Sequence, residues 1–226
     1  MFIGHFAVAF AAKRAAPAVS LGTLFLACQL ADLAWPVLVL AGIERFEILP
    51  GATAFTPLAF IHYPWSHSLA MLALWGVLLG AAWMAVRRGV IRDAAVIAAV
   101  VVSHWVLDAL THRPDMPLAP GGGVKVGVGL WESIPATLAI EGTLFLLCVA
   151  GYVRATHARD AIGHWALWSL VAFLVLVYIA SFMGPPPPST GAVAWTALSM
   201  WLLVAWGYWI DAHRGSGSGS TAAPAA

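Results

Sequence analysis

The stretch DAAVIAAVVVSHWVLDALT, residues 93–111, decides the fold, because it is long and apolar enough to cross a membrane. A membrane-spanning helix needs about 20 mostly apolar residues. The composition of the whole chain agrees, since 62% of its 226 residues are hydrophobic and only 9% are charged, whereas soluble domains carry about 25% charged residues. We therefore expect an all-α fold, a polytopic bundle of membrane-spanning helices.

Further apolar runs of spanning length divide the rest of the chain, at residues 18–43, 67–86, 133–153, 162–183 and 191–211. The opening stretch MFIGHFAVAFAA ends at Lys13 and is too short to span, so it predicts a short helix tucked among the others. The expectation is about six full spans plus this N-terminal helix, in a single domain over residues 1–214. The Gly/Ser/Ala-rich tail, residues 215–226, has the composition of a flexible linker.

The basic residues predict the orientation of the bundle. If the spans alternate in direction, eight of the eleven Lys and Arg residues fall on one side: Lys13, Arg14, Arg87, Arg88, Arg92, Arg154, Arg159 and Arg214. The positive-inside rule makes that side cytoplasmic, together with the C-terminus, and places the long Gly/Pro-rich loops outside. The formal net charge of only +1 gives no reason to expect a nucleic-acid partner.

Ionisable side chains from separate segments fall in the outer half of the predicted bundle. Charges inside a membrane cost a few kcal/mol each, so such groups are expected to face one another or a shared wet cavity. His104, Asp108 and His112 are spaced four apart and form one stripe on a helix. The other members of this set are His5, Asp32, His62, His67 and Glu141.

Imidazole and carboxylate groups together suit a divalent metal, with zinc as the first choice and manganese or iron as alternatives. His104 and Asp108 could grip one ion from one helix face, and the whole set is large enough for one ion or for two about 3.5 to 4 Å apart. The candidate ligands are His5, Asp32, His62, His67, His104 and Asp108.

Glu141 or His112 could then act catalytically by moving protons. Each of these residues also has an ordinary structural explanation. A single His or Asp in a span is often a hydrogen-bonding residue of the core, His62 could be an interfacial loop residue, and His112 could complement the negative end of its helix. Ser66 and Ser103 directly precede candidate ligands and are expected to orient them.

Several of these segments resemble a known family: GHFAVAF, LACQLADLAWP, HYPWSHSL, VVSHWVLDALTHRPDMPL and VGLWESIPATLAIEG. They are similar to segments of the bacterial inner-membrane-associated, metal-dependent hydrolase family, whose founding member is a LexA-regulated hydrolase. The resemblance covers roughly residues 1–145. It implies a metal-dependent hydrolase of the bacterial cytoplasmic membrane with His5, Asp32, His62, His67, His104 and Asp108 as site positions. The chain has LADLAWP where the family often has Pro-Asp-x-Asp, which leaves one carboxylate fewer for a second metal.

Three functions follow from these observations. The first is a membrane-embedded hydrolase of an ester or phosphoester in a lipid or lipid-linked substrate, which reaches the site from the outer leaflet. The second is a proton- or ion-conducting transporter, although the ionisable set stops short of the cytoplasmic half. The third is a membrane subunit or assembly factor whose metal is structural.

Overall fold

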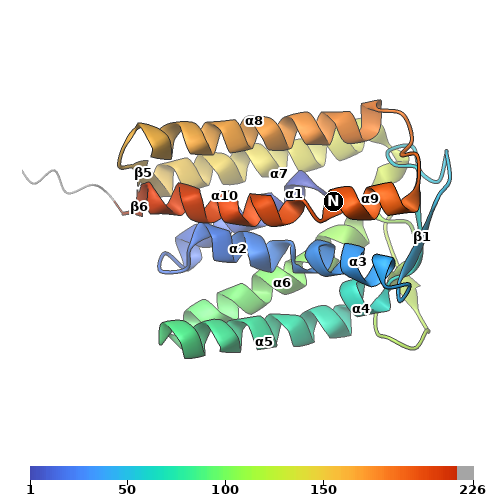
Figure 1. Cartoon of the computed structure of the whole chain (residues 1–226), viewed down its shortest axis with the longest axis horizontal. Helices are drawn as coiled ribbons and strands as arrows, with labels where there is room; N and C mark the ends of the chain where they lie inside the picture. Colours follow the sequence, from blue (N-terminus) through green and yellow to red (C-terminus); the bar gives the residue numbers. More distant parts are fainter. Residues whose placement is uncertain (218–226) are drawn as a thin grey trace, which may run out of the picture.

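The fold is an elongated bundle of helices that run roughly along one axis (Figure 1). The computed structural model describes residues 1–217. Its α-helices are α1 (Ile3–Ala15), α2 (Leu21–Cys28), α3 (Leu30–Leu40), α4 (Pro64–His67), α5 (Leu69–Arg87), α6 (Ile91–Thr111), α7 (Ile134–Ala155), α8 (Ala161–Met183), α9 (Thr190–Ala197) and α10 (Met200–Ala212).

Short two-stranded antiparallel sheets cover the two ends of this bundle (Figure 1). At one end β1 (Arg45–Ile48) pairs with β2 (Leu58–His62) and β3 (Met116–Pro117) pairs with β4 (Lys125–Val126), beside the 3-10 turn η1 (Leu130–Glu132). At the other end β5 (Thr156–Ala158) pairs with β6 (Arg214–Ser216). Both Gly/Pro-rich loops of the sequence are therefore at the end that carries β1 to β4.

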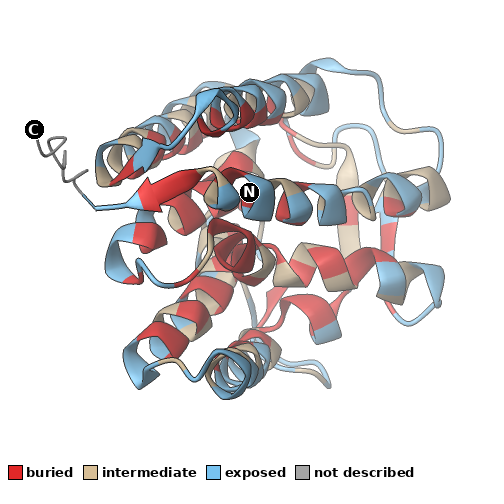
Figure 2. Cartoon of the chain, turned by 60° about the vertical axis from the view of Figure 1, so that its left-hand side comes forward, coloured by how far each residue is buried: buried red, intermediate tan, exposed pale blue. Residues whose placement is uncertain are grey.

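The helices confirm the prediction of an all-α, multi-pass membrane protein. Within residues 1–217, five helical segments are long and apolar enough to cross a membrane, namely α5, α6, α7, α8 and the α9–α10 unit. The bent pair α2 and α3 makes a sixth if it is taken as one span. Apolar side chains such as Val77 and Leu176 stay 62% and 66% exposed on the outward faces, and Figure 2 shows exposed residues along the peripheral helices. These faces are suited to lipid rather than to water.

Helix α1 lies in the middle of the bundle and is buried on nearly all sides. It packs against α7, α2 and α6. Phe6 and Phe10 meet the ring of Phe25 edge-on at centroid distances of 5.0 and 5.3 Å, a favourable geometry for aromatic pairs. The short helix predicted from the opening stretch is therefore the central element of the core.

The span predicted over residues 18–43 is broken at Gln29, where α2 and α3 meet at an angle of 53°. The break interrupts the i to i−4 hydrogen-bond ladder, so the carbonyl of Cys28 is free to accept a bond from elsewhere. Pro36 adds a second gap, because it has no N–H to donate to the carbonyl of Asp32. The irregular backbone is buried inside the protein, which is where a membrane protein tolerates it.

The predicted tail at 215–226 begins later than expected. Gly215 and Ser216 belong to β6, and Arg214 next to them is buried with its guanidinium group bonded to the carbonyls of Gly163 and Thr156. From residue 218 on, the predicted tail lies outside the described residues.

The close approach of α5 and α6 generates the first prediction. A Cβ atom added at Gly80 would lie 2.6 Å from the backbone oxygen of Ala94, which belongs to α6 and cannot move aside as a side chain could. We expect Gly80→Ala to destabilise the bundle by about 1–3 kcal/mol, the usual cost of overpacking. Thermal unfolding of the protein in detergent would measure this.

Gly142→Ala is the matched control, because a Cβ atom at that helical position meets no atom of residues 1–217 within 4 Å. Its melting temperature should stay level or rise slightly, since alanine favours a helix over glycine. Equal melting temperatures for the two variants would contradict the close contact between α5 and α6.

Candidate metal centre

Five of the predicted site residues meet in one buried cluster, although they come from four helices. His5 is on α1, Asp32 on α3, His67 at the end of α4, and His104 and Asp108 on α6. Two groups of three could hold a metal ion, because the possible ligand atoms within each group all lie within 4.8 Å of one another. They are His5, His104 and Asp108, and Asp32, His67 and His104. His104 belongs to both groups. We call these five residues the His/Asp cluster.

Asp108 is the centre of the cluster. Its Oδ1 lies 3.1 Å from His5 Nε2 and 2.5 Å from the amine of Met1, and its Oδ2 lies 3.1 Å from His104 Nε2. The side chain of Asp108 is only 3% exposed. A carboxylate this deeply buried is stable only when positive charge or hydrogen-bond donors surround it, so the partners of Asp108 decide its chemistry.

The orientation of His104 is fixed by the break between α2 and α3. Its Nδ1 lies 2.7 Å from the free carbonyl oxygen of Cys28, and because a carbonyl can only accept, Nδ1 carries the hydrogen. In the neutral ring Nε2 then has a lone pair. This Nε2 has no hydrogen-bond partner among the described residues, although it is buried.

His67 is oriented in the same way by a chain of side chains that the sequence did not reveal in full. The Ser66 hydroxyl donates its single hydrogen to Glu44 Oε2 at 2.6 Å, so its oxygen must accept from His67 Nδ1, also at 2.6 Å. Glu44 is itself held by the backbone N–H groups of Trp65 and Ser66 at the start of α4, at 2.8 and 2.9 Å. The Nε2 of neutral His67 therefore also presents a lone pair to the cluster.

These two lone pairs face carboxylate oxygens. His67 Nε2 lies 3.3 Å from Asp32 Oδ1, and His104 Nε2 lies 3.8 Å from the same atom and 3.1 Å from Asp108 Oδ2. A lone pair and a carboxylate repel each other unless a proton or a metal ion lies between them. Fixing the outer nitrogen of a histidine with a hydrogen bond is what proteins do to hold a metal ligand, so the cluster has the arrangement of a metal centre.

His5 is held differently from the other two histidines. Its ring stacks on that of His104 with a centroid distance of 3.7 Å, and its Nδ1 has no hydrogen-bond partner within residues 1–217. The surroundings of His5 therefore do not determine which of its two ring nitrogens carries the hydrogen. Stacking keeps the ring in place and directs Nε2 to Asp108.

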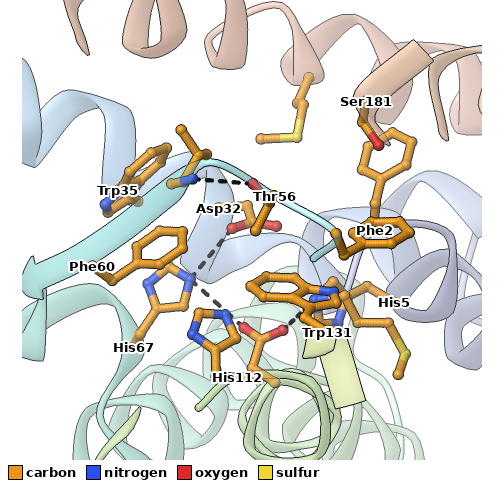
Figure 3. A pocket seen from close by; sticks show the side chains of 15 residues that line it. Phe2, His5, Asp32, Trp35, Thr56, Phe60, His67, His112, Trp131 and Ser181 are labelled. Carbon is orange, nitrogen blue, oxygen red and sulfur yellow. Dashed lines mark hydrogen bonds and ion pairs between the residues drawn. The ribbon is translucent and has the colours of Figure 1, made fainter. Parts of the chain in front are cut away.

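A cavity of about 210 Å³ borders the cluster and is lined by His5, Asp32, His67 and Asp108 (Figure 3). Its other walls are mainly aromatic, with Phe2, Trp35, Phe60 and Trp131. The side chain of Asp32 is 25% exposed, whereas those of His67 and His104 are 4% and 0% exposed. Asp32 is therefore the ligand candidate most accessible to a molecule in this cavity, which we call the cluster cavity.

His112 also lines the cluster cavity, but it is not among the groups with ligand geometry. It ends α6, and its Nδ1 lies 3.0 Å from Asp115 Oδ1. Burial raises the pKa of Asp115, but hydrogen bonds from His112, Tyr63 and Arg113 outweigh burial and lower that pKa below its usual range. An ionised Asp115 holds the hydrogen on His112 Nδ1, which leaves Nε2 as the ring atom that can take up a proton.

Two predicted residues lie apart from the cluster. His62 is exposed on β2 and lines a separate small cavity with Lys125. Glu141 on α7 is buried, and its Oε1 accepts the backbone N–H of Gly4 at 3.0 Å. A carboxylate at the start of a helix satisfies a free N–H and complements the helix dipole, so Glu141 anchors α1 rather than lining the cluster cavity.

The predicted roles of the two serines separate as well. Ser66 contacts the ring of the ligand candidate next to it, as expected, whereas Ser103 donates to the carbonyl of Val100 at 2.7 Å. Glu44 was missed, because an acidic residue in a Gly/Pro-rich loop gives no sign that the folded loop returns it to the start of α4. The Cys28 carbonyl was missed because nothing in an apolar run marks the break at Gln29.

The chain matches no protein-family model, no curated protein and no solved structure. The family resemblance stays a prediction that rests on the sequence motifs alone.

The chain from Glu44 to His67 generates a prediction. In Glu44→Gln the amide oxygen can still accept the two backbone N–H groups, but the amide nitrogen donates to Ser66. The serine hydrogen then turns to His67 Nδ1 and moves the ring hydrogen to Nε2, where it blocks the lone pair. We expect zinc affinity, measured by competition with a chelator, to fall by about 10–100-fold, as for other groups that orient metal ligands.

Glu47→Gln is the matched control, because Glu47 is an exposed acid on the adjacent strand β1. It should bind zinc as tightly as the wild type. Nitrogen NMR shifts of the His67 ring would report the change of tautomer directly, and an unchanged ring in Glu44→Gln would contradict the proposed hydrogen-bond chain.

Proposed function

We propose that the protein is a membrane-embedded, metal-dependent hydrolase that cleaves an ester or phosphoester of a lipid or lipid-linked substrate. The observation that carries the proposal is the convergence of two histidine lone pairs on the carboxylates of Asp32 and Asp108. The other nitrogen of each ring is held by a hydrogen bond. Either a proton or a metal ion would complete such a constellation, and in this proposal a metal ion does so. His67, His104, Asp32 and Asp108 would hold it, with His5 completing the set on the side of α1.

Zinc is the first candidate ion because three imidazoles and two carboxylates match its ligand preference, with manganese or iron as alternatives. A bound divalent ion would polarise a substrate oxygen and make a water molecule acidic enough to attack near neutral pH. The protein itself would supply the rest. Asp32 faces the cluster cavity at the edge of the ligand set, and the aromatic walls exclude bulk water, which strengthens electrostatic interactions inside.

His112 is the better of the two predicted proton-transfer groups. It lines the cluster cavity, and the Asp115 carboxylate fixes the tautomer in which Nε2 can accept a proton from water or return one to a leaving group. Glu141 is engaged by Gly4 and does not line that cavity. We therefore assign proton transfer to His112 and a structural role to Glu141.

A transporter is less well supported than a hydrolase. At the other end of α1, Lys13 pairs with Asp211 at 2.8 Å, and this pair is partly buried. Between it and His5, the core is formed by a cluster of aromatic rings, including Phe10, Phe25 and Tyr152. A proton path needs a continuous series of polar groups, and this layer interrupts it.

A purely structural metal is also less well supported. Structural zinc sites are closed by four protein ligands, whereas catalytic sites keep a position open to water or substrate. The His/Asp cluster forms one wall of a cavity of about 210 Å³, which gives a reacting group room beside the ligands.

The proposed location is the bacterial cytoplasmic membrane, with the C-terminus in the cytoplasm. Lys13, Arg87 and Arg214 lie toward the end of the bundle that carries β5 and β6, and the cluster lies toward the end that carries β1 and β2 (Figure 1). By the positive-inside rule the cluster would then belong to the outer half of the membrane, where a lipid of the outer leaflet could reach it.

Elemental analysis of the purified protein tests the metal site. We expect the wild type to retain zinc, manganese or iron through purification, and His104→Ala to lose it, because His104 belongs to both ligand groups. His164→Ala, which alters an exposed residue at the start of α8, should keep the wild-type metal content. A metal-free wild type that also fails to bind added zinc would end the proposal.

Turnover tests the hydrolase itself. Wild type in nanodiscs should release phosphate or a fatty acid from at least one fluorescent phospholipid of a panel with ester and phosphoester bonds. Asp108→Asn should lose the activity because it removes a charged ligand. It should still give a helical circular-dichroism spectrum, although the Met1 amine loses its buried partner and the melting temperature falls. Loss of one such interaction typically costs about 100-fold or more in rate. A metal-loaded wild type that cleaves none of these bonds, or an Asp108→Asn variant as active as wild type, would count against hydrolysis.

A further inference from the structure

A second cavity, apolar and larger than the cluster cavity, lies beside it. It has a volume of about 650 Å³ and runs between α8 and the α9–α10 unit. Val177 lies on the α8 side and Thr196 on the α9 side, and no charged residue lines it within the described chain. We call this cavity the α8/α9 groove.

The α8/α9 groove adjoins the cluster cavity. Phe2 and Met200 line both of them, so these two side chains form the partition between the metal centre and the groove. Figure 3 shows Phe2 beside His5 and Trp131, on the side of the cluster cavity that Ser181 of α8 also borders. Neither Phe2 nor Met200 is fully buried. A molecule with one end at the cluster could therefore extend past Phe2 into the groove.

Two irregular parts of the backbone border the groove. The tetraproline segment that follows α8 leads into the short helix α9, and α9 ends at Ala197 before α10 begins at Met200. Pro187 and Pro188 line the groove, as do Ala197 and Met200 on either side of this interruption, and α9 packs against α3. Because α8 and the α9–α10 unit are both of membrane-spanning type, the opening between them faces lipid.

We infer that the α8/α9 groove holds a hydrocarbon chain of a membrane lipid whose ester or phosphoester group lies in the cluster cavity. This inference rests on the proposed function, since it gives the lipid substrate a place for its chain. An alkyl chain fits the chemistry of the groove, which offers apolar contacts and no partner for a charge. A chain gains little by moving from lipid into protein, because both are apolar. The role of the groove is therefore to align the bond to be cleaved with the cluster. Correct orientation of the reacting groups lowers the activation barrier of the cleavage.

Photo-crosslinking tests the groove without requiring turnover. The probe is a phosphatidic acid with a diazirine at the end of one acyl chain, in nanodiscs of phosphatidylcholine, and labelled positions are mapped by mass spectrometry. We expect labels to concentrate on the groove-lining residues of α8 and α9. Val177→Trp and Thr196→Phe, each of which fills the groove from one side, should abolish this labelling.

Leu176→Trp is the matched control, because Leu176 is the neighbour of Val177 on α8 but points outward and is 66% exposed. It should leave the groove labelling unchanged. Labels spread evenly over the outward faces of all spans, or groove labels that survive both groove-filling variants, would overturn the inference. A co-purifying membrane polypeptide that fills the groove and excludes the probe would overturn it as well.

The His104→Ala variant separates this inference from the proposed function. Its groove should still be labelled, because the chain site does not depend on a metal. If the protein binds no metal and cleaves no lipid while groove labelling persists and responds to Val177→Trp, the hydrolase proposal fails and the lipid-chain site stands. If metal and turnover are present but the groove is unlabelled, the hydrolase proposal stands and the lipid-chain site fails.

Discussion

The contact on which the site depends is the approach of two histidine Nε2 atoms to the carboxylates of Asp32 and Asp108 within an apolar bundle. Both rings have their other nitrogen committed, one to the carbonyl of Cys28 and one to Ser66. These buried hydrogen bonds direct the histidine lone pairs toward the carboxylates. Lone pairs and carboxylates repel each other unless a proton or a metal ion lies between them. The amine of Met1 pairs with Asp108 Oδ1, whereas Asp108 Oδ2 and Asp32 Oδ1 face the histidine nitrogens. A further positive charge there, either a proton or a metal ion, would stabilise the arrangement.

The elements that position the cluster are the irregular ones. Uninterrupted helices such as α5 and α8 have all their internal carbonyls occupied and can offer a site only side chains. The break at Gln29 instead supplies a backbone acceptor to His104, and the short helix α4 supplies N–H groups that hold Glu44. The regular helices surround these breaks and keep lipid away from them, as a membrane requires.

The sequence predicts the spans and the gathering of charged groups well, for one physical reason. Hydrophobic length fixes where each helix starts and ends in the membrane, and depth then places His5, Asp32, His67, His104 and Asp108 at one level. Depth does not fix the rotation of a helix about its axis. The sequence therefore predicts Glu141 at the cluster, whereas in the structure its side chain contacts Gly4. Loops have no such constraint. The hairpin of β1 and β2 carries His62 outward and brings Glu44 back to Ser66, and neither placement follows from local sequence.

Charge balance bears on the number of ions that the cluster can hold. Asp32 and Asp108 carry the negative charges that contact the histidine nitrogens. Their two charges equal that of one divalent ion, and the amine of Met1 beside Asp108 already adds one positive charge. A second divalent ion would leave excess positive charge in an apolar interior, which is strongly unfavourable, and the amine of Met1 near Asp108 increases that excess. Only a substrate that brings its own negative charge, such as a phosphoester, would restore the balance. Our metal proposal therefore favours one ion over two, and binding of a second ion would be coupled to the arrival of an anionic headgroup.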